Sequence, residues 1–94
     1  MHLCFVKIAV VGSGYVGLVS GTCFAESGNT VYCVDIDEKK VDALKNGQIT
    51  IYEPGLEVLF KRNLKQNRLR FTTSLEEVIN EVEIVFLALP TPPR

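Results

Sequence analysis

The stretch that decides the fold is Val6-Lys-Ile-Ala-Val-Val-Gly-Ser-Gly-Tyr-Val-Gly17. Its first half, residues 6–11, is apolar at every position except Lys7, as expected of a strand that is covered on both faces in a parallel sheet. Three glycines follow in a G-x-G-x-x-G pattern, and helical character begins at Tyr15. We therefore predict a strand, a tight glycine turn and a helix in direct succession, which is the context that a dinucleotide-binding turn requires.

The spacing of the three glycines has a chemical explanation. Gly12 lets the chain turn sharply out of the strand, Gly14 lets backbone amides approach a pyrophosphate, and Gly17 lets the helix pack closely on the strand. A diphosphate would then lie at the N-terminus of the helix, where N–H groups and the positive end of the helix dipole favour an anion. The other residues expected at the diphosphate, mainly through their backbone amides, are Ser13, Tyr15 and Val16.

An acidic residue completes the pattern. A second apolar and β-branched stretch, residues 30–34, delivers Asp35 to its carboxyl end, 18 residues after Gly17. In dinucleotide folds an acidic residue at this place binds the ribose hydroxyls. A carboxylate there, with Asp37 nearby, also repels a 2′-phosphate, so the sequence favours NAD over NADP. The plainer alternatives are a glycine turn without a ligand and a surface carboxylate at the end of a strand.

The rest of the chain alternates between helical and extended patterns. Helix signals include Asp37 as an N-cap and the capping-box pattern Ser74-Leu-Glu-Glu77. The expected elements are strands at 6–11, 30–34, 68–72 and 84–89 and helices at 15–27, 38–45, 56–66 and 74–80. Strands that alternate with helices predict an α/β fold, namely a Rossmann-type doubly wound parallel sheet with strand order 3-2-1-4.

The last expected strand, residues 84–89, is the longest apolar run in the chain, and we expect it to be buried on both faces. No linker or repeat divides the sequence. We therefore expect one unit over residues 1–94, the N-terminal part of an NAD-binding domain that is truncated after about four strands. The last strand should then present an unpaired edge, which favours self-association.

Composition argues against several classes of protein. The formal net charge is -1 and basic residues are scattered among acidic ones, so we expect no nucleic acid partner. No apolar run approaches the roughly 20 residues that span a bilayer, so no membrane partner is expected. Cys4, Cys23 and Cys33 lack the spacing of a metal site or disulfide scaffold, which favours the cytoplasm. We expect Cys23 and Cys33 to be small buried residues.

Several blocks of the sequence together resemble a known family. The blocks are residues 11–21, 34–37, 51–56 and 68–73, followed by Thr91-Pro92. They resemble the N-terminal region of the UDP-glucose/GDP-mannose dehydrogenase family, most closely its UDP-glucose 6-dehydrogenases. The block Tyr52-Glu-Pro-Gly-Leu56 makes the resemblance more specific than the glycines do, because it has no general role in dinucleotide folds.

The resemblance implies an enzyme that uses two NAD⁺ to oxidise C6 of UDP-glucose through an aldehyde to the carboxylate of UDP-glucuronate. In this family the second oxidation passes through a thioester on a cysteine. That cysteine and its helper residues lie in segments downstream of this sequence, and none of the three cysteines here matches it. The resemblance therefore implies a homo-oligomeric enzyme whose catalytic residues lie outside these 94 residues.

The resemblance also adds cofactor residues. Lys40 matches a basic position that reaches the adenosine ribose, although a solvated helix lysine explains it nearly as well. Thr91 matches a threonine near the nicotinamide, with a capped turn before Pro92 as the alternative. The residues expected on this side of the cofactor, beyond the last strand, are Leu89, Pro90 and Thr91. Glu53 is expected to have a structural role and no chemistry.

Three other functions stay open at the level of sequence. The first is a regulatory domain that senses NAD or NADH without catalysis. The second is a dehydrogenase for another nucleotide sugar, such as GDP-mannose or UDP-N-acetylmannosamine. The third is a flavoprotein, because FAD is bound by a similar glycine turn.

Overall fold

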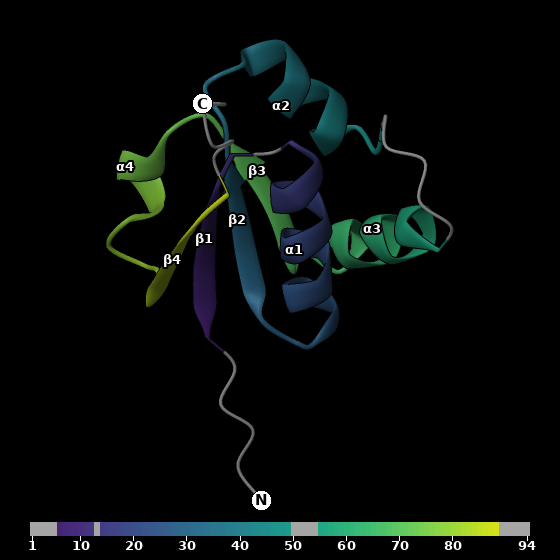
Figure 1. Ribbon diagram of the computed structural model, residues 1–94, viewed down its shortest axis with the longest axis horizontal. Coiled ribbons are helices and arrows are strands. Elements are labelled where there is room, and N and C mark those ends of the chain that lie inside the picture. Colours follow the sequence, from purple (N-terminus) through teal and green to yellow (C-terminus); the bar gives the residue numbers. More distant parts are fainter. Residues whose placement is uncertain (1–5, 13, 50–54, 89–94) are drawn as a thin grey trace, which may run out of the picture.

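The protein folds around a four-stranded parallel sheet, seen here in a computed structural model that describes residues 6–12, 14–49 and 55–88 (Figure 1). The elements along the chain are β1 (Lys7–Val11), α1 (Tyr15–Glu26), β2 (Thr30–Val34), α2 (Glu38–Lys45), α3 (Leu56–Lys65), β3 (Leu69–Thr72), α4 (Leu75–Val78) and β4 (Ile84–Leu87). Their order in the sheet is β3-β2-β1-β4, with every neighbouring pair parallel. The predicted α/β fold and strand order are confirmed.

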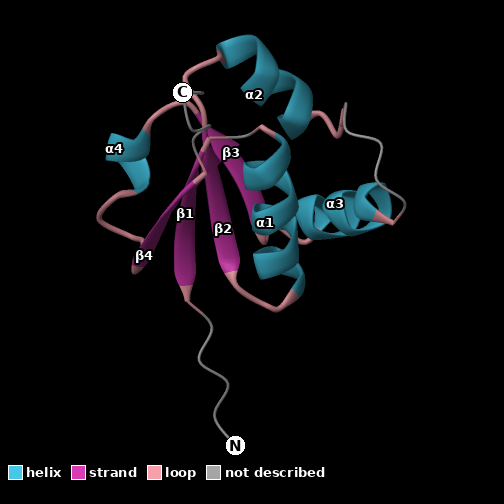
Figure 2. Ribbon diagram, viewed as in Figure 1, coloured by secondary structure: helices cyan, strands magenta, loops and turns pink. Residues whose placement is uncertain are grey.

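Helices lie on both faces of this sheet. In Figure 2, α1 lies in front of the strands with α3 to its right, and both helices contribute residues to the main core. On the other face, α4 contributes Val78 to a smaller cluster with Tyr32 and Val34 of β2. This division follows from chain direction, because right-handed crossovers place helices on opposite faces once the strand order reverses between β3 and β4.

The main core is built from alternate residues of the strands and the inner faces of three helices. Its largest fully buried side chain is Phe60 of α3, whose ring lies 5.9 Å from that of Phe71 on β3. The other buried members of this cluster are Ile8, Val10, Leu18, Ala25, Val31, Cys33, Val41, Leu44 and Leu69. Removal of this apolar surface from water is the main force that holds the helices on the sheet.

Small residues let α1 lie close to the strands. A Cβ placed on Gly21 would come within 2.9 Å of the Sγ atom of Cys33, so the helix backbone nearly touches the sheet there. Cys33 itself is buried, as expected, and burial raises the pKa of its thiol to about 12. Cys23, which lies on α1, is exposed, so its predicted burial is wrong. The four-residue spacing of Gly17, Gly21 and Ala25 defines the inner face of α1, and Cys23 lies off that face.

A polar clamp joins the end of α1 to α3 and to Arg68, the residue just before β3. The fully buried Asn63 donates from Nδ2 to Oε1 of Glu26 at 2.9 Å and accepts at Oδ1 from Nε of Arg68, also at 2.9 Å. Arg62 adds an ion pair of 2.8 Å to the other oxygen of Glu26. The Asn63 hydrogen bond is the main reason that the pKa of Glu26 is held below its usual value, with Arg62 assisting and desolvation opposing.

Two predicted caps can be compared with the structure. Asp37 caps α2 as predicted, accepting the N–H groups of Lys39 and Lys40. Ser74 accepts the N–H of Glu77, but its own N–H donates to the hydroxyl of Thr72. The capping box is therefore only half formed, because the strand residue just before the helix competes for the donor.

The prediction that the last strand is buried on both faces is wrong. The four residues of β4 are between 36% and 66% exposed, although they pair in register with the buried β1. Only Phe86 meets an aromatic partner on a helix, with its ring centroid 5.7 Å from that of Phe24 on α1. In the described part of the chain β4 is an edge strand, and α4 is too short to cover its outer portion.

Candidate functional site

The carboxyl edge of the sheet begins with the turn out of β1. Gly12 has φ of +102°, a left-handed conformation that glycine adopts without a steric penalty. Its N–H donates to the carbonyl of Val34 at 2.7 Å, so the turn stays attached to the end of β2. The glycine that was predicted to redirect the chain therefore has a left-handed backbone, whereas Gly14 of the same motif does not.

Gly17 brings the helix against this turn. A Cβ at Gly17 would overlap the carbonyl oxygen of Gly12 and lie 3.3 Å from the Cβ of Ala88, which follows β4. Any larger residue would push α1 away from the ends of β1 and β4. This geometry agrees with the predicted packing role of the third glycine.

Gly14 has a different environment. It is the N-cap of α1 in an extended conformation, with φ of −73°, and a Cβ there would meet no described atom within 4 Å. The first turn of the helix, Tyr15-Val-Gly-Leu18, contains no acidic residue. The start of a helix has N–H groups that lack intrahelical acceptors, and their dipole favours negative charge. An open approach, no side chain at Gly14 and no competing carboxylate in the first turn fit a diphosphate at this end of α1.

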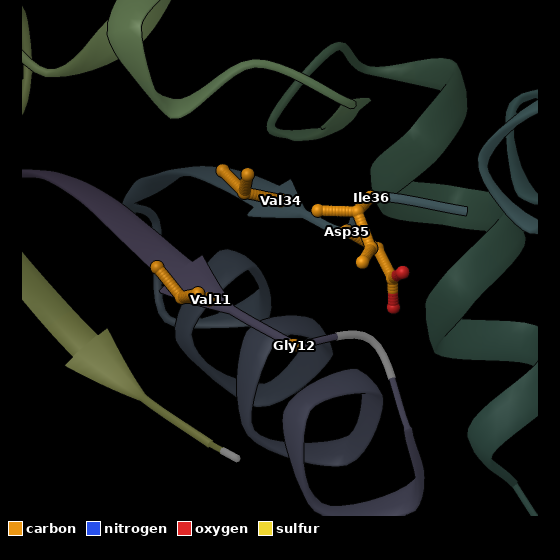
Figure 3. Close-up of a pocket in the computed structure, with 5 residues that line it drawn as sticks. All are labelled: Val11, Gly12, Val34, Asp35 and Ile36. Carbon is orange, nitrogen blue, oxygen red and sulfur yellow. The ribbon is translucent and has the colours of Figure 1, made fainter. Parts of the chain in front are cut away.

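A pocket of about 170 Å³ lies between the ends of β1 and β2 (Figure 3). It is lined by Val11, Gly12, Val34, Asp35 and Ile36. The lining combines two apolar strand residues, the glycine turn and one carboxylate. Such a pocket at the carboxyl end of parallel strands is where ligands bind in open α/β sheets.

Asp35 is the polar group of this pocket, and its side chain is 15% exposed. Oδ1 accepts the backbone N–H of Asp37 at 2.9 Å, and Oδ2 lies 3.5 Å from Nζ of Lys40. The backbone N–H of Asp35 donates to the carbonyl of Thr72 on β3. The carboxylate is thus held from two sides at the edge of the pocket, in a position to accept hydrogen bonds from hydroxyl groups.

The structure brings together most of the predicted residues that it describes. Gly12 and Gly14 lie in the turn and Gly17 in the first turn of α1, while Asp35, which pairs with Lys40, lines the same pocket as Gly12. Tyr15 begins α1, and Val16 follows it with an exposed side chain. The predicted residues that lie outside the described ranges are Ser13, Glu53, Leu89, Pro90 and Thr91.

Sequence reasoning missed Ile36 as a pocket residue. Its side chain is 92% exposed, although it is flanked by two aspartates at the end of a buried strand. An apolar side chain left in solvent beside a pocket offers a surface for a flat apolar group. The signal in the sequence was an isoleucine placed just beyond the predicted strand, where burial in the sheet could no longer explain it.

The described residues contain neither a metal site nor a membrane-spanning helix. Among the described residues, no group of three or more histidine, cysteine or acidic side chains is arranged to hold a metal ion. None of the helices in the described ranges has the length and apolar character needed to cross a membrane.

Comparisons with known proteins agree with this geometry. Residues 6–94 match the model of the UDP-glucose/GDP-mannose dehydrogenase family, NAD binding domain. The chain is 57% identical over 86 residues to the UDP-glucose 6-dehydrogenase TuaD of Bacillus subtilis, a match that covers 92% of this chain and 19% of that protein.

Solved structures give the same result. A UDP-glucose dehydrogenase from Pyrobaculum islandicum superimposes with a TM-score of 0.88 at 38% identity, over 97% of this chain and 21% of that one. A GDP-mannose dehydrogenase from Pseudomonas aeruginosa, solved as a ternary complex, gives a TM-score of 0.86 at 33% identity, over 93% of this chain and 20% of that one. The chain therefore spans about one fifth of the length of the relatives it matches.

Proposed function

This chain belongs to the UDP-glucose/GDP-mannose dehydrogenase family, as an NAD-binding domain, and from that premise we propose how its residues bind NAD⁺. The cofactor lies across the carboxyl edge of the sheet, with its diphosphate at the glycine turn and its adenosine ribose at Asp35. The observation that carries the proposal is the pocket that joins Gly12 to Asp35.

The diphosphate end is formed by main-chain atoms. The residues proposed to contact it are Gly12, Ser13, Gly14, Tyr15, Val16 and Gly17. At Gly14 the absence of a Cβ leaves open space beside the first turn of α1. Backbone N–H groups can then donate to phosphate oxygens without moving, and the helix dipole adds a favourable field for the negative charge.

The adenosine end is formed by side chains. The carboxylate of Asp35 accepts hydrogen bonds from the ribose hydroxyls, and Ile36 provides an apolar surface for the adenine ring. A 2′-phosphate at the same place would be close to the carboxylate, and like charges repel strongly in a partly desolvated site. This arrangement favours NAD⁺ over NADP⁺.

The nicotinamide end is assigned to Leu89, Pro90 and Thr91, which follow β4. Support comes from the position of β4, whose pairing with β1 places its carboxyl end beside the glycine turn. The backbone N–H of Ala88 donates to the carbonyl of Val11 at 2.9 Å, so the residue after β4 is still attached to β1. Ligands of open α/β sheets bind in the crevice outside these strand ends.

For the whole protein we propose a UDP-glucose 6-dehydrogenase that converts UDP-glucose, two NAD⁺ and water into UDP-glucuronate and two NADH. NAD⁺ supplies a hydride acceptor for each of the two oxidations. The relative from Bacillus subtilis and the structure from Pyrobaculum islandicum favour UDP-glucose as the sugar nucleotide. These 94 residues, the N-terminal part of that enzyme, bind the cofactor and catalyse nothing alone. The full-length enzyme is proposed to be a cytoplasmic homo-oligomer.

Calorimetric titration of the 94-residue chain with NAD⁺, NADP⁺ and FAD tests the cofactor assignment. We expect NAD⁺ to bind about tenfold or more tightly than NADP⁺, because the 2′-phosphate meets Asp35. Tighter binding of FAD than of NAD⁺ would reject this proposal and indicate a flavoprotein. A folded chain that binds none of the three would contradict it.

A further inference from the structure

Two donors from the start of α2 converge on one carboxylate of the pocket, that of Asp35. The Asp37 N–H lies 2.9 Å from Oδ1 of Asp35, and the Lys40 ammonium lies 3.5 Å from Oδ2. The lysine is not buried by this contact, since its side chain is 43% exposed. One donor is fixed by the main chain at the start of α2, and the other is a mobile cation. Together they form a small cradle for an anion, and Asp35 occupies it.

We infer that Lys40 is a latent ligand for the 2′-phosphate of NADP, blocked in this chain by Asp35. The inference rests on the proposed function, because it takes Asp35 as the residue at the adenosine ribose. The choice between NAD and NADP would then depend mainly on the Asp35 carboxylate. The two groups that could bind a 2′-phosphate, the Asp37 N–H and the Lys40 ammonium, already lie beside it.

The charges explain why Asp35 contributes most to the preference for NAD over NADP. A phosphate monoester carries about −1.5 to −2 at neutral pH and offers three strong acceptor oxygens. With Asp35 present, this charge would meet a carboxylate whose two oxygens hold both donors. Without Asp35, the fixed N–H of Asp37 and the ammonium of Lys40 become available to the phosphate, and charge-assisted hydrogen bonds of this kind are the strong ones.

Asp37 does not take over the blocking role. Its carboxylate accepts the backbone N–H groups of Lys39 and Lys40 at 3.1 and 3.2 Å, as the cap of α2. These hydrogen bonds hold it at the helix start. Its charge reduces the gain expected from removal of Asp35 but leaves Lys40 free to move toward the ribose position.

The test uses short ligands that contain only the adenosine end. The 94-residue chain and its Asp35→Ser variant are titrated with 2′,5′-ADP, which carries the 2′-phosphate, and with 5′-AMP, which lacks it. We expect Asp35→Ser to bind 2′,5′-ADP about tenfold tighter than the unmodified chain does. Adding Lys40→Gln should remove most of that gain, and its loss for 2′,5′-ADP should exceed any loss for 5′-AMP, because only 2′,5′-ADP carries the 2′-phosphate.

Lys39→Gln in the Asp35→Ser background is the matched control, because it removes the same charge one residue away. It should keep the gain for 2′,5′-ADP. Equal losses from the two lysine changes, or no loss from Lys40→Gln, would overturn the inference. Circular dichroism checks folding, and Asp35→Asn, which keeps the shape of the side chain, replaces Asp35→Ser if that variant is unfolded.

Binding of NAD⁺ by the unmodified chain distinguishes a failure of the Lys40 role from a failure of the proposed function. If NAD⁺ binds but Asp35→Ser gains no affinity for 2′,5′-ADP, the role of Lys40 is wrong and the proposed function stands. If the folded, unmodified chain binds neither NAD⁺ nor 5′-AMP, the proposed function fails and the inference fails with it.

Discussion

Strands β1 and β4 are neighbours of similar apolar character, yet they have opposite environments. The central residues of β1 are buried beneath α1 on one face and toward α4 on the other, whereas every residue of β4 is exposed. β1 also has hydrogen-bonded neighbours on both sides, and β4 lies at the edge of the described sheet. An apolar sequence therefore indicates that a strand is suited to burial, but the elements around the strand determine whether it is buried.

The difference in burial between β1 and β4 also distinguishes the candidate site from the edge of the sheet formed by β4. The glycine turn and Asp35 lie where β1 and β2 are fully packed, so their positions are fixed by the covered core. Strand β4 itself lacks that cover within the described residues. We expect perturbations of the covered region to have much larger effects than perturbations of β4.

The largest effect is expected from Gly17→Ala. The new Cβ, held in place by the helix backbone, would overlap the carbonyl oxygen of Gly12, and neither atom can move without separating α1 from the sheet. A loss of more than about 5 kcal/mol is expected, which would unfold a domain at the lower end of the usual range of stability.

Gly14→Ala is the matched control, since its Cβ would meet no described atom within 4 Å. Urea unfolding followed by circular dichroism should show a native transition for Gly14→Ala and none for Gly17→Ala. Equal stability of the two variants would mean that the contact of α1 with the turn is looser than the structure indicates.

A pair of phenylalanines compares the covered and exposed regions directly. Phe60→Ala removes a fully buried ring from the main core, with an expected loss of about 3 to 5 kcal/mol. Phe86→Ala removes a partly exposed ring from β4, with an expected loss of about 1 to 2 kcal/mol. Urea unfolding gives both values. A larger loss at Phe86 would show that β4 is covered in solution.

The clamp between α1 and α3 should give the covered region its own pH dependence. The pKa of Glu26 is lower in the folded chain than its ordinary value of 4.5, so its stabilising contribution is complete above that value and is lost as pH falls through the folded pKa. Glu26→Gln should therefore reduce stability at pH 7, and the difference from the unmodified chain should shrink in acid. Thermal unfolding between pH 7 and pH 3 measures this. A difference that does not change with pH would contradict the charged role of Glu26.

The smallest effect on stability is expected at the exposed strand. Leu87→Lys should change the free energy of unfolding by no more than about 0.5 kcal/mol, because Leu87 is already exposed. It should reduce self-association, since a lysine on an edge strand opposes pairing with a second chain. Sedimentation velocity at several concentrations measures this, with Val58→Lys on the exposed side of α3 as control. Equal self-association of both variants would place the contact elsewhere.

Much of this architecture is readable from the sequence because local signals agree with one another. Gly12, Asp37 and the alternation of apolar stretches each specify a local conformation, and together they gave the strand order. The polar clamp was not readable, because Asn63 has helical spacing like an ordinary core position and its partner Glu26 lies 37 residues away. Ile36 was missed for a related reason, since its exposure depends on where β2 ends.

The two wrong predictions, burial of β4 and burial of Cys23, have a common cause. Both predictions assumed that an apolar residue on a regular element is covered. Cys23 is exposed because it lies off the inner face of α1. Strand β4 is exposed because no element in the described ranges covers it. Neither is a property of the residue itself, so neither can be inferred from composition.

The central claim is that the packed glycine turn and Asp35 together bind NAD⁺. The most direct test is a titration of the isotope-labelled chain with NAD⁺, followed by its backbone amide resonances. We predict large shifts at Gly12, Gly14, Gly17 and Asp35, and small ones along α3. Saturating NAD⁺ that leaves those four resonances unmoved in the folded chain would contradict the account.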